Sequence, residues 1–182
     1  MQSEISLEKD LYTRAQVLLA TDNPSNKISA MMLLHELVYS IKSDGSEDQR
    51  FWKGHAAIAL ADLYLVGVES CLYVTDDGEV YSNTYVRSDL LKAYELYRRA
   101  LKYECYDGVT CIADIYFLLG DTTNAIQWYR AVVEYGFKGA ENAQKVLDEL
   151  ISSGRINKNE VPNHVPKPQY SPSFVFYTPS KK

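Results

Sequence analysis

The fold of this chain is decided by two stretches, KAYELYRRALKY at residues 92–103 and NAIQWYRAVVEY at residues 124–135. They align at an offset of 32 residues, and one alanine, one arginine and two tyrosines are identical in the two stretches. In both stretches the apolar residues recur at the i, i+3, i+4, i+7 spacing of one helix face. The two stretches therefore predict two equivalent amphipathic helices.

A second pair of similar segments lies ahead of these helices, LADLY at residues 60–64 and IADIY at residues 112–116. Each carries a small residue, an aspartate, an apolar residue and a tyrosine in the same order. The chain is thus built from repeated helix pairs, a pattern typical of helical solenoids. The small residues let the two backbones approach, and the aromatic ring fills the space beside them.

Three further helices are expected from apolar spacing, over about 6–20, 25–41 and 140–152, the last ending near Gly154. Only Pro24 interrupts the first 161 residues, so long helices are allowed almost everywhere in that part of the chain. Start signals stand at Ser46 and Gln49, which have the form of a capping box, at Ser88 or Asp89, and at Asp121.

These residues resemble Sel1-like repeats, close relatives of tetratricopeptide repeats. The resemblance covers about 54–151 well and 6–41 faintly, and the nine-residue spacing from Tyr116 to Ala125 is the tetratricopeptide one. It implies an all-α fold, in which about seven helices form a short right-handed α-solenoid of antiparallel pairs. The matching residues are Ala56, Leu60, Tyr64, Gly67, Lys92, Ala93 and Tyr97, then Ile112, Ala113, Tyr116, Ala125, Trp128 and Tyr129.

Two segments depart from the repeat pattern. Between Gly67 and Ser88 the chain is rich in Val, Tyr and Thr around a turn signal at 76–78, which predicts an inserted β-hairpin over about 68–88. Five of the six prolines lie at or after Pro162, which predicts an extended tail. The expected organisation is a helical-repeat domain at 1–155 followed by a Pro-rich tail at 156–182.

Composition excludes several classes of protein. The 182 residues carry a net charge of −5, which argues against nonspecific nucleic-acid binding. The chain shows no secretory signal and no apolar stretch of membrane-spanning length. Three cysteines without a signal favour reduced thiols in the cytoplasm. No phosphate-binding loop, catalytic motif or four-ligand zinc spacing is present, so we expect no catalytic residues, no cofactor and no metal.

Asp62 and Asp114 occupy the same position in successive units. In a solenoid the first helix of each pair lines the concave surface, where two carboxylates could meet a basic partner. The alternatives are a solvated helix face or a pair with an arginine of a neighbouring helix. A hydrolase using both carboxylates would need an enclosing cleft and a raised pKa, and the sequence supports neither.

The remaining candidate residues lie in the two added segments. Of the 15 tyrosines, those of the hairpin and the tail are not explained by the repeats. Hairpin tyrosines either bind a partner or pack back on the helices, and tail aromatics pack on the fold, on a partner or on a second copy. The tail is expected to pack on the fold. The candidates are Tyr73, Asp76, Asp77, Tyr81 and Tyr85 in the hairpin, and Tyr170, Phe174, Phe176 and Tyr177 in the tail.

The sequence thus predicts a non-enzymatic protein-protein interaction module, an adaptor, regulator or inhibitor that binds through its concave face, hairpin or tail. Such repeats serve mainly as adaptors and scaffolds, often in bacteria, as the resemblance implies. A sharper alternative is a cytoplasmic immunity protein that neutralises a basic toxin or effector domain by acidic complementarity. A carboxylate-dependent hydrolase and self-association through tail or hairpin are further alternatives.

Overall fold

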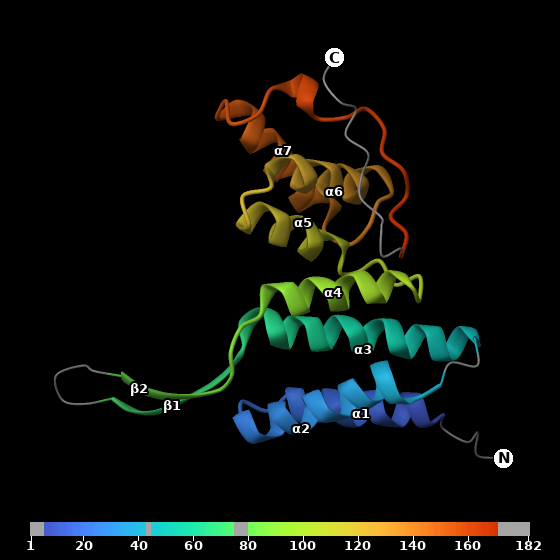
Figure 1. The fold of residues 1–182 in the computed structure, drawn as a ribbon, viewed down its shortest axis with the longest axis vertical. Helices are drawn as coiled ribbons and strands as arrows, with labels where there is room; N and C mark the ends of the chain where they lie inside the picture. Colours follow the sequence, from blue (N-terminus) through green and yellow to red (C-terminus); the bar gives the residue numbers. More distant parts are fainter. Residues whose placement is uncertain (1–5, 43–44, 75–79, 171–182) are drawn as a thin grey trace. The chain divides into compact units, whose positions relative to one another are not determined.

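The computed structural model describes residues 6–42, 45–74 and 80–170 (Figure 1). The described residues are mostly helical, as expected for an all-α protein, and contain seven α-helices and one pair of strands. The chain forms two compact units, residues 1–104 and residues 105–182. The sequence suggests a division near 155, but in the structure the residues after 155 group with the helices before them.

The first unit contains two neighbouring helix pairs, α1 with α2 and α3 with α4, and α2 also lies against α3 (Figure 1). A π-helical turn, η1, continues α2, so that together they span almost the whole of the expected segment 25–41. In chain order the elements are α1 (Leu7–Leu19), α2 (Pro24–His35), η1 (Glu36–Ser40), α3 (Glu47–Val66), β1 (Val68–Val74), β2 (Val80–Val86) and α4 (Leu90–Leu101).

Side-chain caps fix where these helices begin. The Ser46 hydroxyl accepts a hydrogen bond from the Gln49 amide at 3.2 Å at the start of α3. The Gln49 side chain is buried and donates to Glu8 Oε1 and to the Lys42 carbonyl, so it ties α3 to α1. Asp89 caps α4 by accepting from the Lys92 amide at 2.9 Å, which decides between the two cap positions that the sequence offers.

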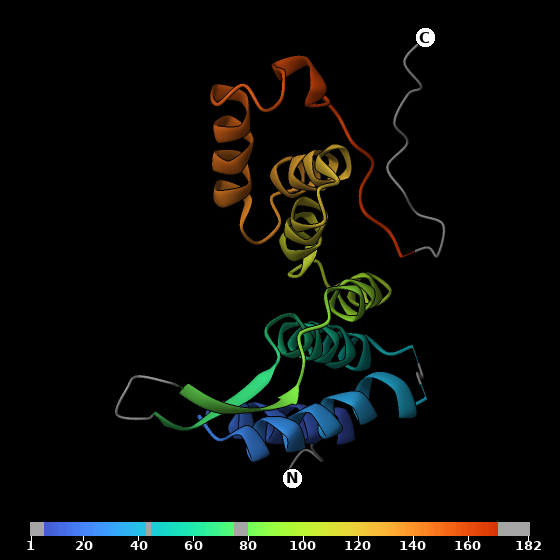
Figure 2. The same ribbon diagram turned by 60° about the vertical axis from the view of Figure 1, so that its left-hand side comes forward.

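Strands β1 and β2 pair antiparallel, from Val68 opposite Val86 to Val74 opposite Val80. In both views the pair runs outward from the end of α3 (Figures 1 and 2). Gly67 precedes β1 with φ +84° and ψ 177°, a conformation that only glycine adopts readily. The chain returns beside it, where the Asp89 amide donates to the Tyr64 carbonyl at 2.7 Å. The turn that the sequence predicts at 76–78 lies outside the described residues.

The second unit contains three α-helices and an irregular segment. The helices are α5 (Val109–Leu118), α6 (Thr122–Glu134) and α7 (Ala140–Ser152), and a 3₁₀ turn, η2 (Lys158–Glu160), follows them. Asp121 caps α6, as expected, by accepting from the Asn124 amide at 3.1 Å. Gly154, with φ +69°, ends α7 as a left-handed residue, which confirms the position expected from the sequence. Residues 161–170 then run alongside α6 without regular secondary structure (Figure 2).

The helix faces predicted from apolar spacing form the core. On α4, all five residues of the predicted face are buried, and on α6 four of five are buried. Ala61 of α3 and Ala113 of α5 are fully buried, so the partner helices α4 and α6 approach closely at these small residues. The predicted core faces are Ala93, Leu96, Tyr97, Ala100 and Leu101 on α4, and Ala125, Trp128, Tyr129, Val132 and Val133 on α6. None of the described helices has the length and apolar character needed to cross a membrane.

Candidate functional site

The two repeated aspartates each accept a hydrogen bond from the repeated tyrosine of the partner helix. Tyr97 of α4 donates to Asp62 Oδ1 of α3 at 2.5 Å, and Tyr129 of α6 donates to Asp114 Oδ1 of α5 at 2.6 Å. The paired residues are 35 apart in the first unit and 15 apart in the second, because the segment between α3 and α4, which includes β1 and β2, is longer than the segment between α5 and α6. The sequence alternatives, a solvated face or an arginine pair, did not include this tyrosine partner.

The tyrosine side of each pair is buried and the aspartate side is exposed. Tyr97 is 1% exposed and Tyr129 is 3% exposed, whereas Asp62 and Asp114 are exposed. Burial, together with the hydrogen bond to Asp114, raises the pKa of the Tyr129 phenol above its usual range. The Tyr129 phenol therefore stays protonated and orients the Asp114 carboxylate.

An exposed apolar side chain follows each aspartate by one helical turn. Val66, four residues after Asp62, is 77% exposed, and Leu118, four residues after Asp114, is 67% exposed. Residues at i and i+4 lie on the same helix face. Both α3 and α5 thus present an oriented carboxylate beside an unburied aliphatic side chain, and we call each such combination an Asp-aliphatic face.

In the first unit this face borders an open groove of about 340 Å³ formed by α1, α2 and α3. Asp62, Leu63 and Val66 of α3 line one side, and Leu19 of α1 and Lys27 of α2 are among the residues opposite. The Lys27 ammonium pairs with Asp22 at 3.0 Å. Asp62 belongs to the first unit and Asp114 to the second, and the hydrolase alternative stays a prediction.

The hairpin candidates lie partly outside the described residues. Tyr73 of β1 is opposite Tyr81 of β2 in the register of the pair, and Tyr85 lies near the end of β2. Asp76 and Asp77 fall in the undescribed segment 75–79. Strands β1 and β2 lie within the segment 68–88 where the sequence predicts a hairpin. The hairpin itself, and the choice between a partner and the helices for its tyrosines, stay predictions.

The tail packs on its own unit as far as Pro168. Arg130 of α6 donates to the carbonyls of Pro162 and Asn163 at 3.1 and 2.8 Å. Tyr135 donates to the Val165 carbonyl at 2.9 Å, and Glu134 accepts from the Val165 amide at 3.0 Å. Tyr170 is 41% exposed, and Phe174, Phe176 and Tyr177 lie beyond the described residues. We call Arg130, Glu134 and Tyr135 the tail-binding face.

Charges reinforce this contact. Partial burial opposes ionisation of Glu134, but the hydrogen bond from the Val165 amide, the contact with His164 and nearby Arg130 lower its pKa overall. Arg130 Nη2 lies 3.8 Å from Glu134 Oε2. Sequence reasoning gave no sign of these partners of Arg130 and Glu134. The 32-residue offset did single out Tyr135, although it gave no sign that its hydroxyl binds the tail.

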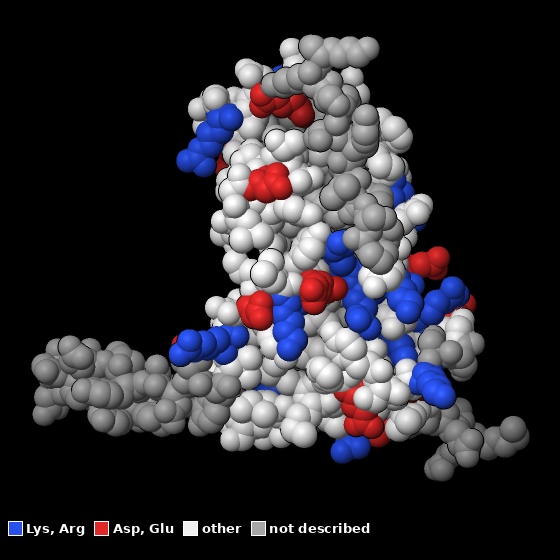
Figure 3. All heavy atoms as spheres, in the orientation of Figure 1, with Lys and Arg blue, Asp and Glu red and all other residues white. Residues whose placement is uncertain are grey.

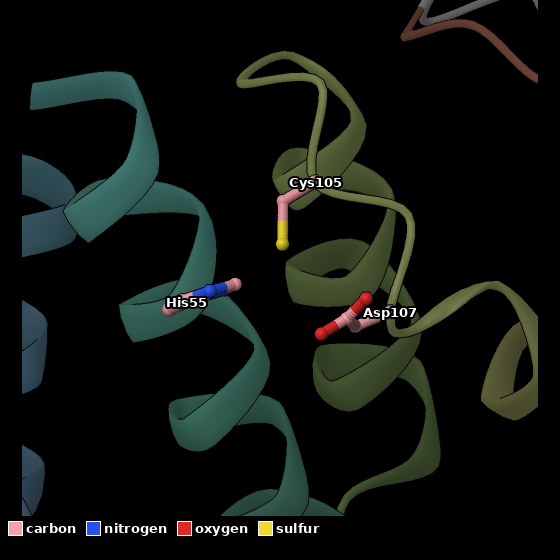
Figure 4. Close-up of side chains that lie close together, drawn as sticks. All are labelled: His55, Cys105 and Asp107. Atoms are coloured by element: carbon pink, nitrogen blue, oxygen red, sulfur yellow. The ribbon is translucent and has the colours of Figure 1, made fainter. Parts of the chain in front are cut away.

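His35 and His55 lie against aromatic rings, and Cys105 is buried. The His35 ring lies 4.4 Å from the Tyr39 ring, and His55 lies within α3, where its ring contacts Phe51 edge to face. Figure 4 shows His55 on α3 and, in the segment just before α5, Cys105 and Asp107. Burial raises the pKa of the Cys105 thiol, which keeps it protonated and poorly nucleophilic.

Basic side chains gather on one face of the first unit, over α3 and α4 (Figure 3). Several of them lie on aromatic rings. The Arg99 guanidinium stands 4.3 Å from the Tyr39 ring, and the Lys92 ammonium stands 4.4 Å from the Tyr64 ring. A hydrogen bond with Tyr64 raises the pKa of Lys92 despite some desolvation. The charged ends of Lys92 and Arg99 thus lie over aromatic rings.

Comparisons with known proteins add no relative. No family model matches the chain, and neither a curated protein nor a solved structure matches it.

Proposed function

We propose that the protein is a non-enzymatic protein-binding module. Its helix pairs would form a short right-handed solenoid of Sel1-like or tetratricopeptide-like character, with β1 and β2 as an inserted hairpin. The support is the equivalence of two helix pairs, α3 with α4 and α5 with α6, which share small residues, a tyrosine and an aspartate at corresponding positions. The same hydrogen bond joins the partner helices in both pairs.

The observation that carries the proposal is the repetition of the Asp-aliphatic face on α3 and α5. A carboxylate held by a buried phenol loses little further freedom on binding, which favours affinity. The neighbouring Val66 and Leu118 offer apolar area that a partner can remove from water. The fitting partner is a protein surface with a Lys or Arg next to an apolar side chain.

Charge reversal tests this proposal. The full chain, the variant Asp62→Arg with Asp114→Arg and a matched control are immobilised and incubated with an extract of the native host. The control is Glu141→Arg with Glu149→Arg, two exposed residues of α7 that have the same charge change. We expect a protein that the wild type and the control capture and the Asp variant loses. Equal capture by all three proteins would contradict the proposed face.

A second candidate, an immunity protein that covers a basic toxin or effector domain, draws on the distribution of charge. Residues 1–104 contain 16 Asp and Glu against 11 Lys and Arg, whereas residues 105–182 contain eight of each. The whole acidic excess thus belongs to the first unit. Because the face in Figure 3 gathers basic side chains, a basic partner would have to bind elsewhere on that unit. Capture that weakens steeply between 50 and 500 mM salt supports this candidate, and salt-independent capture contradicts it.

A further inference from the structure

The described part of the tail has a burial pattern with a period of three residues. Val165, 1% exposed, and Pro168 are buried, Pro162 is half-buried, and the residues between them are all exposed. A polyproline II helix has three residues per turn, so residues 162, 165 and 168 lie on one side of such a segment. The tail therefore presents one face, made of two prolines and a valine, to its own unit.

The surface beneath this segment includes a row of three aromatic rings. The Tyr135 and Phe137 ring centroids are 5.7 Å apart, and those of Phe137 and Tyr106 are 4.7 Å apart with an interplanar angle of 2°. Tyr135 donates to the Val165 carbonyl, and the Lys167 ammonium stands 4.6 Å from the Tyr106 ring. Aromatic surfaces of this kind bind proline-rich segments in several recognition domains.

The side chains of the tail-binding face form their hydrogen bonds with the main chain of the tail. The hydrogen bonds from Arg130 and Tyr135 end on backbone carbonyls, and Glu134 accepts from a backbone amide. Of the side chains in the segment, His164 contacts Glu134 and Lys167 lies over the Tyr106 ring. Any extended peptide with a small aliphatic residue at the position of Val165 could make the same main-chain contacts.

The surface is also larger than the segment that occupies it. At the start of the segment, an open hollow of about 420 Å³ lies between α6, α7, η2 and residues 161–163. Leu147 and Ile151 of α7 provide its apolar side, and Lys158 and Asp148 are among its polar lining residues. A longer peptide has room to continue into this hollow.

We propose that the tail-binding face and the aromatic row form a groove for proline-containing peptides. Residues 162–168 occupy it in cis, and a partner protein's polyproline II segment with the pattern Pro-x-x-(Val/Ile)-x-x-Pro occupies it in trans. The groove lies on α6 and the rings beside it, so it is distinct from the Asp-aliphatic faces and does not depend on them. A tethered occupant competes at an effective concentration on the order of millimolar, so the tail acts as a built-in competitor.

The test uses a fluorescein-labelled peptide of residues 160–170 and fluorescence anisotropy with the full chain. Val165→Asp in the protein places a carboxylate in the buried position next to Glu134 and releases the tail. We expect the peptide to bind this variant at least about tenfold more tightly than the wild type, because the tethered competitor is gone. Adding Arg130→Ala to the variant should reverse most of the gain, and adding Lys145→Ala, at an exposed site of α7, should not.

Two controls keep the outcome decisive. A peptide carrying the same Val-to-Asp change should bind at least tenfold more weakly, and Val165→Gly in the protein releases the tail without burying a charge. Circular dichroism checks that each variant is folded. A folded variant that does not bind the peptide, or that binds both peptides equally, would overturn the proposal. Loss of folding in both Val165 variants would overturn it too, because a groove that needs its own tail to exist cannot accept a partner.

Discussion

An added methyl group at Gly67 tests how closely the chain returns beside this residue in the first unit. A Cβ at this residue would lie 2.8 Å from the Val86 carbonyl oxygen and 3.1 Å from the Ser88 amide nitrogen. Both are backbone atoms, so neither can rotate away. The φ and ψ values of Gly67 also lie in a region that is strained by roughly 1–3 kcal/mol for other residues. Overpacking against fixed atoms adds about 1–3 kcal/mol.

We therefore expect Gly67→Ala to lower the free energy of unfolding by about 3 kcal/mol or more. The matched control is Gly120→Ala, where φ is +79° and nothing lies within 4 Å of the added Cβ, so only about 1–2 kcal/mol of backbone strain applies. Urea unfolding followed by circular dichroism at 222 nm gives both values. If the two variants agreed within about 0.5 kcal/mol, the close return of the chain after β2 would be refuted, because the extra methyl would then meet no obstacle.

Three further substitutions probe the helix pairs and the tail. Tyr129→Phe should cost about 1 kcal/mol at pH 7 in urea unfolding. Folding raises the pKa of Tyr129, so the extra stability of the wild type over Tyr129→Phe is complete below the ordinary phenol pKa of about 10. This difference in the free energy of unfolding is lost as the pH rises toward the pKa of Tyr129 in the folded protein. A difference at pH 11 equal to that at pH 7 would contradict this expectation. Folding lowers the Glu134 pKa, so its stabilisation of the tail is present above the ordinary carboxyl pKa and is lost as pH falls through the folded value. Hydrogen exchange at the Val165 amide should report that loss in the wild type, and in Glu134→Gln exchange should already be fast at neutral pH. Ala113→Leu should destabilise by about 1–3 kcal/mol, measured by thermal unfolding, because no space remains at this fully buried residue; an unchanged Tm would mean that the helices are not closely packed there.

The helices were predictable because their signals are local. Burial of Leu96, Tyr97 and Trp128 follows from apolar spacing within single helices, and Asp121 marks a helix start by its own side chain. The repeat offset extended these local signals to helix pairs. It also placed Asp62 and Asp114 at equivalent positions. Their hydrogen bonds with tyrosines could not be predicted, because they depend on how the two helices of each pair pack.

The tail contact was less accessible to sequence reasoning. Arg130 and Tyr135 donate to main-chain carbonyls, which every residue has, so the residue types of the tail give no sign of these hydrogen bonds. One usable signal was present, the three-residue spacing of Pro162, Val165 and Pro168, which apolar helix periods do not reveal. The division of the chain after Glu104 likewise depends on contacts of residues distant in sequence.

The position of the tail segment has a consequence for synthesis. Domains tend to fold in order as the chain emerges, at about 5–20 residues per second. The helix that carries Arg130 and Glu134 is made some 30 residues before Val165, so for roughly 2–6 s the growing chain exposes this surface with no segment of its own to cover it. A partner that is translated nearby would meet the uncovered surface during that interval, and assembly during translation would then precede competition from the finished chain.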